Sequence, residues 1–210
     1  MKRIVLFGAP GAGKGSVADL LSVRLSFPTI STGDLVRAEI RGQTEIGRKV
    51  QEITARGELV PDPVIIGMLD RRVKQADVKS GYILDGFPRT PAQAQALAAL
   101  PADEERAVFL DVGEDVVVER LLGRLTCQKC GAIYNRKGKM PAQAGVCNRC
   151  GGTVAARSDD NEDSIRQRLQ VYLRETQPVI DYYKQKGLLR TIDGVGTVEE
   201  VFARLLEALA

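Results

Sequence analysis

Gly8-Ala9-Pro10-Gly11-Ala12-Gly13-Lys14-Gly15-Ser16 is the most informative segment of the sequence for the fold. It follows a short apolar run at residues 4–7, and it precedes residues 17–25, whose apolar side chains recur at helical spacing. A strand, a glycine-rich turn and a helix in this order are the setting of a phosphate-binding loop. Glycine has no Cβ, so successive backbone N–H groups can point at a phosphate, and the helix N-terminus adds partial positive charge. The stretch predicts a polyphosphate site, in which Lys14 reaches the β- and γ-phosphates and Ser16 holds a phosphate oxygen or a metal ion.

Length and composition favour one main domain with insertions, because 210 residues with 44% hydrophobic content can bury a single substantial core. The first apolar run has four residues, too few for a signal peptide, and we expect a cytoplasmic protein without a membrane segment. The net charge of +3 does not by itself imply a nucleic-acid binder, but 20 of the 30 basic residues are arginine, which suits phosphate. The chain has no histidine, which excludes a Ser-His-Asp triad, a phosphohistidine and a histidine-ligated metal.

Strand and helix patterns alternate along the rest of the chain. Strands are expected at residues 27–30, 82–85, 107–112 and 188–192, and helices at residues 35–40, 46–54, 62–75, 91–100, 116–122, 161–186 and 198–209. We expect Asp62 and either Asp159 or Asp160 to cap the helices that follow them, and Pro178 to kink or split the longest helix. This alternation predicts a parallel sheet covered on both faces, with a ligand at the carboxyl ends of the strands.

A second strand and loop, Asp85-Gly86-Phe87-Pro88-Arg89-Thr90, follows an apolar run. An apolar run that ends in Asp85 resembles the Walker-B arrangement, in which a carboxylate holds Mg²⁺ through water. Gly86 would let the backbone approach a ligand, Pro88 would fix the turn, and Arg89 would be presented from the edge of the sheet. An ordinary strand, turn and helix with a chance arginine is the alternative.

Arg120 and Arg124 lie four residues apart, on one face of an expected helix. They could clamp a phosphate or an adenine ring, or lie exposed, and the helix pattern alone favours exposure.

Two Cys-x-x-Cys pairs, each followed by glycine, are separated by sixteen residues. Cys127, Cys130, Cys147 and Cys150 are the four cysteines of the chain, and their spacing predicts tetrahedral thiolate coordination of a structural zinc ion. Two disulfides are the alternative, which a cytosolic setting disfavours. Four thiolates leave no open position for water, so the ion would be structural rather than catalytic. It would stabilise a segment that is too small to have a hydrophobic core of its own.

In the phosphate loop Gly15 follows the lysine and the hydroxyl comes one residue later, a form that resembles nucleoside monophosphate kinases. Ser31-Thr32-Gly33-Asp34, the Asp85 to Thr90 string, Arg120, Arg124, the four cysteines, Arg157-Ser158-Asp159-Asp160 and Arg168 follow in the order typical of adenylate kinases. The chain resembles the long-lid, zinc-containing bacterial form of that family from end to end. The resemblance implies an α/β fold of the P-loop NTPase type: a five-stranded parallel sheet with helices on both faces, a helical AMP-binding insertion and a small zinc-stapled lid.

The resemblance also implies domain boundaries and a reaction. The core would comprise residues 1–30, 61–123 and 162–210, the AMP-binding insertion residues 31–60 and the lid residues 124–161. The enzyme would transfer the terminal phosphoryl group of Mg·ATP reversibly to AMP, giving two ADP. Mg²⁺ would accompany ATP, near Asp85, and zinc would be structural. ATP, AMP and ADP would be its partners, nucleic acid and membrane would not, and the chain would be a monomer.

Residue roles follow from the same resemblance. The catalytic residues would be Lys14, Arg89, Arg124, Arg157 and Arg168. ATP would be bound by Gly11, Ala12, Gly13, Lys14, Gly15, Ser16, Arg120, Arg124, Ile133, Tyr134 and Gly196. AMP would be bound by Thr32, Arg37, Glu58, Leu59, Val60, Gly86, Phe87, Pro88, Arg89, Gln93, Arg157 and Arg168. The chain departs from the family at Leu125, where a second arginine is common, at Asn135, where histidine is frequent, and at Gly196, which has no side chain.

Two other functions stay open at this stage. The nearest is a kinase of the same fold for UMP, CMP or GMP. The other is a zinc-ribbon module that binds nucleic acid, because Lys129, Arg136, Lys137, Lys139 and Arg149 lie near the cysteines. That region has a single aromatic residue, Tyr134, and therefore no stacking platform for bases.

Overall fold

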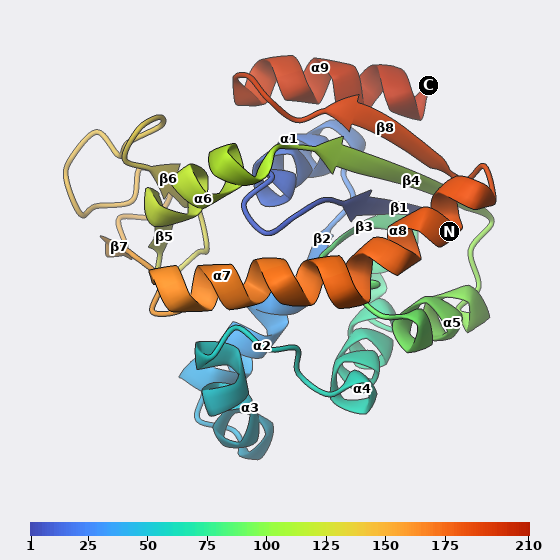
Figure 1. Ribbon diagram of the computed structural model, residues 1–210, viewed down its shortest axis with the longest axis horizontal. Helices are drawn as coiled ribbons and strands as arrows, with labels where there is room; N and C mark the ends of the chain where they lie inside the picture. The colour runs from blue at the N-terminus through green and yellow to red at the C-terminus, as the bar shows by residue number, and fades with distance from the viewer.

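The main sheet of the computed structural model, which describes residues 1–210, has five strands in the order β2-β3-β1-β4-β8 (Figure 1). The strands are β1 (Lys2–Phe7), β2 (Thr29–Ser31), β3 (Gly81–Asp85), β4 (Glu104–Asp111) and β8 (Leu189–Asp193). Every neighbouring pair is parallel, and Leu6 of β1 lies opposite Asp85 of β3. The glycine-rich loop and Asp85 therefore leave the same edge of the sheet. The five-stranded parallel sheet predicted from the sequence is confirmed.

Helices cover both faces of this sheet. Successive residues of β1 point to opposite faces, and because all of them from Ile4 to Phe7 are apolar, both faces have to be buried. Ile4 and Leu6 belong to a buried cluster with residues of α1 (Lys14–Leu25) and α9 (Val198–Leu209). Val5 and Phe7 pack in the other cluster, against residues of α4 (Asp62–Val73), α5 (Pro91–Ala99) and α8 (Gln177–Gln185).

Three helices separate β2 from β3, as the sequence predicted: α2 (Thr32–Arg41), α3 (Glu45–Ala55) and α4, followed by a 3₁₀ turn at Ala76–Val78. Ser31 caps α2 by accepting a hydrogen bond from the backbone N–H of Asp34. The prediction that Asp62 caps α4 is wrong, since α4 begins at Asp62 and Pro61 precedes it without a side-chain cap. The Asp62 carboxylate accepts hydrogen bonds from Thr90 and Gln93 instead.

A second, antiparallel sheet follows α6 (Glu114–Leu122). Its strands are β5 (Arg124–Cys127), β6 (Ile133–Asn135) and β7 (Val154–Ala155), in the order β6-β5-β7. Figure 1 shows it at the left end of the molecule, apart from the five-stranded sheet. We call residues 124–155 the cysteine module. Its strands of two to four residues are too short for hydrophobic periodicity to reveal, and the sequence did not predict them.

The predicted helix at residues 161–186 is divided in the structure. It consists of α7 (Glu162–Val171), a π-helical turn at Tyr172–Thr176 and α8. Pro178, in the first turn of α8, has no N–H to donate to the carbonyl of Arg174, and the helix widens at that point. The predicted caps, Asp159 and Asp160, are wrong: Asn161 caps α7 by accepting from the N–H of Ser164, while both aspartates pair with arginines.

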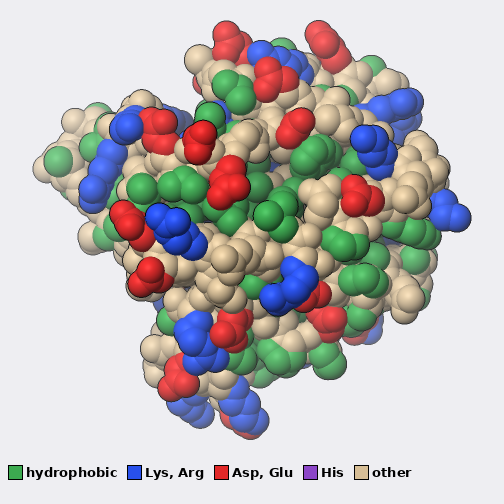
Figure 2. Space-filling model, viewed as in Figure 1, with side chains coloured by type: hydrophobic (Ala, Val, Ile, Leu, Met, Phe, Trp, Pro, Cys, Tyr) green, Lys and Arg blue, Asp and Glu red, His purple; other side chains and the backbone are tan.

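The surface is mixed in charge. Figure 2 shows acidic and basic side chains interspersed on the face in view, with hydrophobic side chains gathered near its middle. No helix combines the length and the apolar character that crossing a bilayer requires.

Candidate active site

The phosphate loop has the backbone shape that the glycine spacing predicted. Gly11 and Gly13 adopt φ of 87° and 98°, which side chains rarely tolerate. Gly13 precedes α1 without any side-chain cap, and the backbone N–H groups of Lys14 and Gly15 stay free for a ligand, whereas that of Ser16 donates to the carbonyl of Gly13 at 3.0 Å. The Nζ atom of Lys14 donates to the carbonyl oxygens of Gly8 at 2.7 Å and Ala9 at 2.9 Å, which turns the ammonium group inward over the loop.

Gly15 lies close to side chains of two other segments. A Cβ atom on Gly15 would lie 2.9 Å from Cδ1 of Ile133 and 3.5 Å from an oxygen of Asp85. A side chain here would require the terminal carbon of Ile133 to shift, and Ser16 carries the hydroxyl instead. The same distance puts Ile133, predicted at the ATP site, against the phosphate loop.

Four arginines come together from four segments of the chain, and we call them the arginine cluster: Arg89 after β3, Arg124 at the start of β5, Arg157 after β7, and Arg168 in α7. The charges of Arg89, Arg124 and Arg168 act on Lys14 of the phosphate loop, and Arg157 lies beside Arg124. Arg89 Nε donates to the carbonyl of Gly86 at 2.7 Å, and Arg157 Nε donates to the hydroxyl of Thr126 at 2.9 Å. All of the predicted catalytic residues are thus brought to one end of the main sheet.

Asp159 and Asp160 hold two members of the cluster. Arg124 forms a two-pronged pair with Asp160, with Nε and Nη2 at 2.7 and 2.6 Å from the two carboxylate oxygens. Arg168 Nη1 lies 2.9 Å from the same carboxylate and 3.5 Å from that of Asp159. The Asp160 side chain is only 2% exposed. Sequence reasoning assigned these aspartates to a helix cap and missed this role, although their position between Arg157 and Arg168 was a usable indication.

Burial and mutual repulsion act on these cations. The pKa of Lys14 is lowered to about 8, chiefly by burial and also by the charges of Arg89, Arg168 and Arg124, against the opposing effect of Asp85. Burial, followed by Arg168, lowers the pKa of Arg89 to about 10. Burial, followed by Arg124 and Arg37, lowers the pKa of Arg157 to about 9. The site therefore holds more positive charge than its carboxylates balance, which is the electrostatic setting for a polyphosphate.

A cavity opens beside the cluster, between α2, the segment before α4 and the loop after β3. Of the residues predicted for AMP it is lined by Thr32, Arg37, Glu58, Leu59, Val60, Gly86, Arg89, Gln93 and Arg168. The other predicted AMP residues do not line it. Phe87 is buried in the core, Pro88 is buried beside it, and Arg157 is held by Thr126.

On the ATP side, Arg120 is a bridge rather than an exposed residue. Its Nη1 atom donates to the carbonyl of Ala12 at 3.2 Å and to that of Gly194 at 3.1 Å, which ties the phosphate loop to the turn before α9. Gly196 lies in that turn, against Glu200. The hydroxyl of Tyr134 points away from the loop, into the cysteine module.

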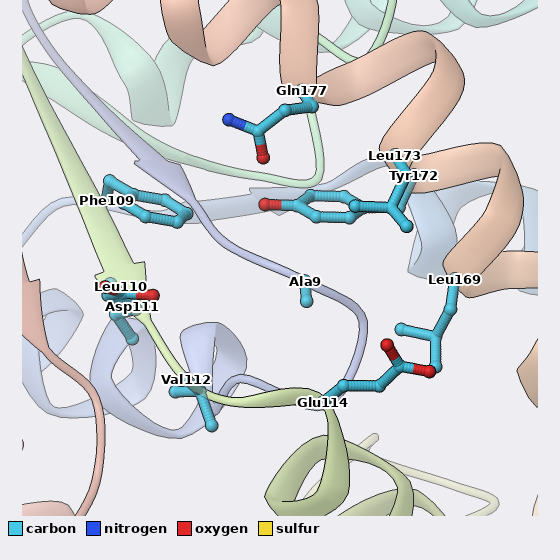
Figure 3. A pocket seen from close by; sticks show the side chains of 10 residues that line it. All are labelled: Ala9, Phe109, Leu110, Asp111, Val112, Glu114, Leu169, Tyr172, Leu173 and Gln177. Atoms are coloured by element: carbon cyan, nitrogen blue, oxygen red, sulfur yellow. The ribbon is translucent and has the colours of Figure 1, made fainter.

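Figure 3 shows a second cavity, between the end of β4 and the helical segment at residues 169–177. The ring of Tyr172 points across it toward Phe109, with Gln177 above the ring and Ala9 of the phosphate loop at one wall. It contains none of the side chains predicted for either nucleotide, and its lining is largely apolar.

The four cysteines gather in the cysteine module. Their sulfur atoms lie within 4.8 Å of one another, with Cys127 and Cys150 at 3.5 Å and Cys130 and Cys147 at 3.6 Å, and none is in a disulfide. A tetrahedral zinc ion with Zn–S bonds of about 2.3 Å requires sulfur separations of about 3.8 Å, so the donor set fits zinc. Tyr134 supports it: its hydroxyl lies 3.4 Å from Cys147 Sγ, and this hydrogen bond lowers the pKa of that thiol.

Asp85, which the sequence predicts near a magnesium ion, lies beside the phosphate loop. It ends β3, beside the phosphate loop, and a Cβ on Gly15 would approach its carboxylate to 3.5 Å. Carboxylate oxygens next to a phosphate site are the ligands that Mg²⁺ prefers.

Comparison with known proteins gives a consistent result. The family model described as adenylate kinase matches residues 6–188. Adenylate kinases of Thermodesulfovibrio yellowstonii and Methanosarcina acetivorans are each 46% identical to the chain, over 95% of both sequences for the first and over 99% of this chain and 98% of the relative for the second. The adenylate kinase of a Geobacillus species is 44% identical, over 99% of this chain and 98% of the relative.

Proposed function

This chain belongs to the adenylate kinase family, whose reaction is the transfer of a phosphoryl group from ATP to AMP to give two ADP, and from that membership we propose how its residues carry the reaction. The observation that supports the proposal most strongly is the convergence of Lys14 and the arginine cluster on the phosphate loop. ATP and AMP would lie on opposite sides of this cluster, with their phosphates between the two groups of binding residues.

The two nucleotides would use different parts of the chain. The phosphates of ATP would lie on the backbone N–H groups of residues 11–16, with Arg120, Ile133, Tyr134 and Gly196 nearby. AMP would occupy the cavity lined by Thr32, Arg37 and Gln93, with its phosphate toward Arg89. The burial of Tyr134 favours a contact through its backbone rather than its ring.

The chemistry would rest on charge and position. Phosphoryl transfer proceeds through a loose transition state whose charge spreads over the equatorial oxygens. Lys14, Arg89, Arg124, Arg157 and Arg168 would neutralise that charge, each arginine contributing about 10³ to 10⁵ in rate. The acceptor phosphate is already largely deprotonated near neutral pH, so no strong general base is needed, in keeping with a chain without histidine.

Magnesium, which the family uses with ATP, would lie near Asp85 and supply positive charge between the phosphates. Zinc in the four-cysteine cluster would be structural, because a closed thiolate shell has no position for water or substrate.

Water competes with AMP as acceptor, so the site has to close before transfer. We propose that residues 124–161 form a lid, hinged near Arg124 and Asp160, which brings Arg157 to the phosphates, and that residues 31–60 form the AMP-binding insertion. The separate antiparallel sheet and the contact of Ile133 with Gly15 support the lid. The adenylate kinase lid is itself an established example of such gating.

A monomer in the cytoplasm, without nucleic-acid or membrane partners, stays the prediction from the sequence. Base choice is the open point, since UMP, CMP or GMP kinases share the architecture.

The decisive assay measures ADP formation from Mg·ATP with AMP, beside UMP, CMP, GMP and no acceptor. We expect fast transfer to AMP alone and a loss of several orders of magnitude in Arg89→Ala. Arg166→Ala, on the exposed side of α7, is the matched control and should keep full activity. Preference for another monophosphate would replace the substrate, and transfer to none of them would contradict the enzymatic assignment. A salt-dependent gel shift with single-stranded nucleic acid would then test the remaining alternative.

A further inference from the structure

Gln93 lies in the first turn of α5, and its side chain reaches the AMP cavity although only 2% of the residue is exposed. Its amide forms hydrogen bonds with two neighbours, one at the oxygen and one at the nitrogen. The backbone N–H of Arg89 donates to Oε1 at 2.8 Å, and Nε2 donates to a carboxylate oxygen of Asp62 at 2.7 Å.

These two partners allow only one orientation of the amide. A backbone N–H group can only donate, so it must face the amide oxygen, and a carboxylate accepts, so it must face the amide nitrogen. Turning the amide over would set N–H against N–H at Arg89 and oxygen against oxygen at Asp62. Both hydrogen bonds would be lost in a nearly buried place, where unpaired polar groups are costly.

Asp62 is itself held in place by Thr90. The Thr90 hydroxyl accepts a hydrogen bond from the N–H of Gln93 at 3.2 Å, as the cap of α5. Its own hydrogen is therefore free to go to the second carboxylate oxygen of Asp62, at 2.8 Å. Both oxygens of Asp62 are engaged by α5 and its cap, and the carboxylate cannot turn away without breaking one of these bonds.

The locked amide keeps a defined edge free. One N–H of Nε2 and one lone pair of Oε1 remain, a donor beside an acceptor. Adenine offers an amino donor at C6 beside a ring-nitrogen acceptor, which matches this edge. A 6-oxopurine in the same position as adenine offers a carbonyl acceptor in place of the amino group and an N–H donor in place of the ring nitrogen, and it matches the amide only when the amide is turned over.

We propose that Asp62 is a specificity-determining residue, which locks the amide of Gln93 in the orientation that accepts adenine and rejects 6-oxopurine bases. The proposal rests on the proposed function, because it takes the base of the monophosphate to lie against Gln93. Asp62 does not touch the base. It is a positioning residue that acts through Gln93.

The test compares AMP with inosine monophosphate as acceptors for wild type, Asp62→Ala and Asp62→Asn. Asp62→Ala frees the amide, and the ratio of kcat/KM for AMP to that for inosine monophosphate should fall about tenfold or more, as expected for the loss of a hydrogen bond to a charged group. KM for ATP should not change. Asparagine can still accept from Nε2, so Asp62→Asn should keep most of the preference.

Asp70→Ala is the matched control, since Asp70 lies on the same helix and pairs with Lys74 at the exposed surface. It should match the wild type for both acceptors. An unchanged ratio in Asp62→Ala would overturn the proposal and leave the kinase assignment intact. A wild type that does not use AMP would instead contradict the proposed function. An equal loss in Asp62→Ala and Asp62→Asn, with a raised KM for ATP, would indicate a merely structural role and would also overturn the proposal.

A measurement on the wild type covers the case in which Asp62→Ala does not fold. The side-chain amide of Gln93 is observed by ¹H–¹⁵N NMR in the nucleotide-free protein. We expect the proton donated to Asp62 to exchange slowly with solvent. Rapid exchange of both amide protons would show that the amide is not locked and would overturn the proposal.

Discussion

The two sheets of this protein are stabilised in different ways. The five-stranded sheet lies between buried clusters of 19 and 12 apolar residues. The buried cluster of the cysteine module has four members, two of which are cysteines. Apolar burial is sufficient for the first sheet, but a segment with so small a core needs a cross-link or a metal to fold. One half of the site therefore lies on a sheet that its apolar core stabilises, and the other half on a module that depends on its four cysteines.

The cations that we propose to be catalytic are divided between these two sheets. Lys14 and Arg89 follow strands of the main sheet, whereas Arg124 is the first residue of the cysteine module and Arg157 follows its last strand. Arg168 stands between them on α7 and shares Asp160 with Arg124. The cluster is therefore complete only when the two sheets are held together.

Removing the metal site should have the largest effect on the difference in stability between the two sheets. Binding of structural zinc contributes about 10 to 16 kcal/mol in small zinc modules, so Cys150→Ser should unfold the cysteine module and leave the main sheet folded. Amide hydrogen exchange should become fast in β5–β7 and stay slow in β1 and β4. Gln128→Ser, at an exposed position in the same module, is the control and should change neither.

Chelation tests the same point in the unaltered chain. Extraction of zinc should lower the melting temperature more than it lowers turnover at low temperature. Equal melting temperatures with and without metal would contradict the dependence of the module on its cysteines.

The next largest effect is expected on catalysis, from the loss of Arg157, which follows the last strand of the cysteine module. Arg157→Ala should reduce kcat about 10³- to 10⁵-fold while the melting temperature stays near that of the wild type, because the cation acts on the transition state. Steady-state kinetics and thermal melting of the same sample check this. Arg149→Ala removes an exposed arginine from the neighbouring cysteine module and should be active. Equal activity of the two variants would remove Arg157 from the mechanism.

A core substitution tests whether the main sheet depends on its apolar core for its free energy of unfolding. Leu110 is 0% exposed between the sheet and its helices, and Leu110→Ala should lower the free energy of unfolding by about 2 to 5 kcal/mol. Leu122→Ala, at a residue 45% exposed, should change it by less than about 0.5 kcal/mol. Chemical denaturation measures both. A cost for Leu110→Ala no greater than that for Leu122→Ala would mean that the main sheet does not depend on its apolar core.

The smallest expected effect is a pH dependence at Lys14. Its pKa of about 8 lies below the ordinary value of 10.5, so in this window the unfolded chain binds more protons than the folded one. The free energy of unfolding of the nucleotide-free protein therefore gains a contribution that rises with pH from about 8 to 10.5. Lys14→Met should remove that rise, whereas Lys184→Met, at an exposed lysine, should keep it. Denaturation at pH 7 and at about pH 9.5 compares the slopes, and an identical slope in wild type and Lys14→Met would contradict the burial of this charge.

The parts of the fold that follow local rules could be predicted. The phosphate loop, Asp85 at the end of β3 and the paired cysteines each carry their chemistry within a few residues. Caps and breaks were less predictable, because Asp62, Asp159 and Asp160 have carboxylates that could serve either a helix N-terminus or a distant partner. All three carboxylates bind distant side chains instead of capping a helix. A buried arginine or glutamine needs an acceptor, whereas an exposed helix end can bind water.

The class of fold, the phosphate loop and the paired cysteines could be predicted from the sequence, because glycine conformation, hydrophobic periodicity and cysteine spacing are local properties. The contact of Ile133 with Gly15, the pairing of Asp160 with Arg124 and Arg168, and the hydrogen bond of Gln93 to Asp62 depend on tertiary packing. Those contacts join residues 8 to 118 positions apart, and the packing of the elements, not a spacing in the chain, brings their atoms within reach.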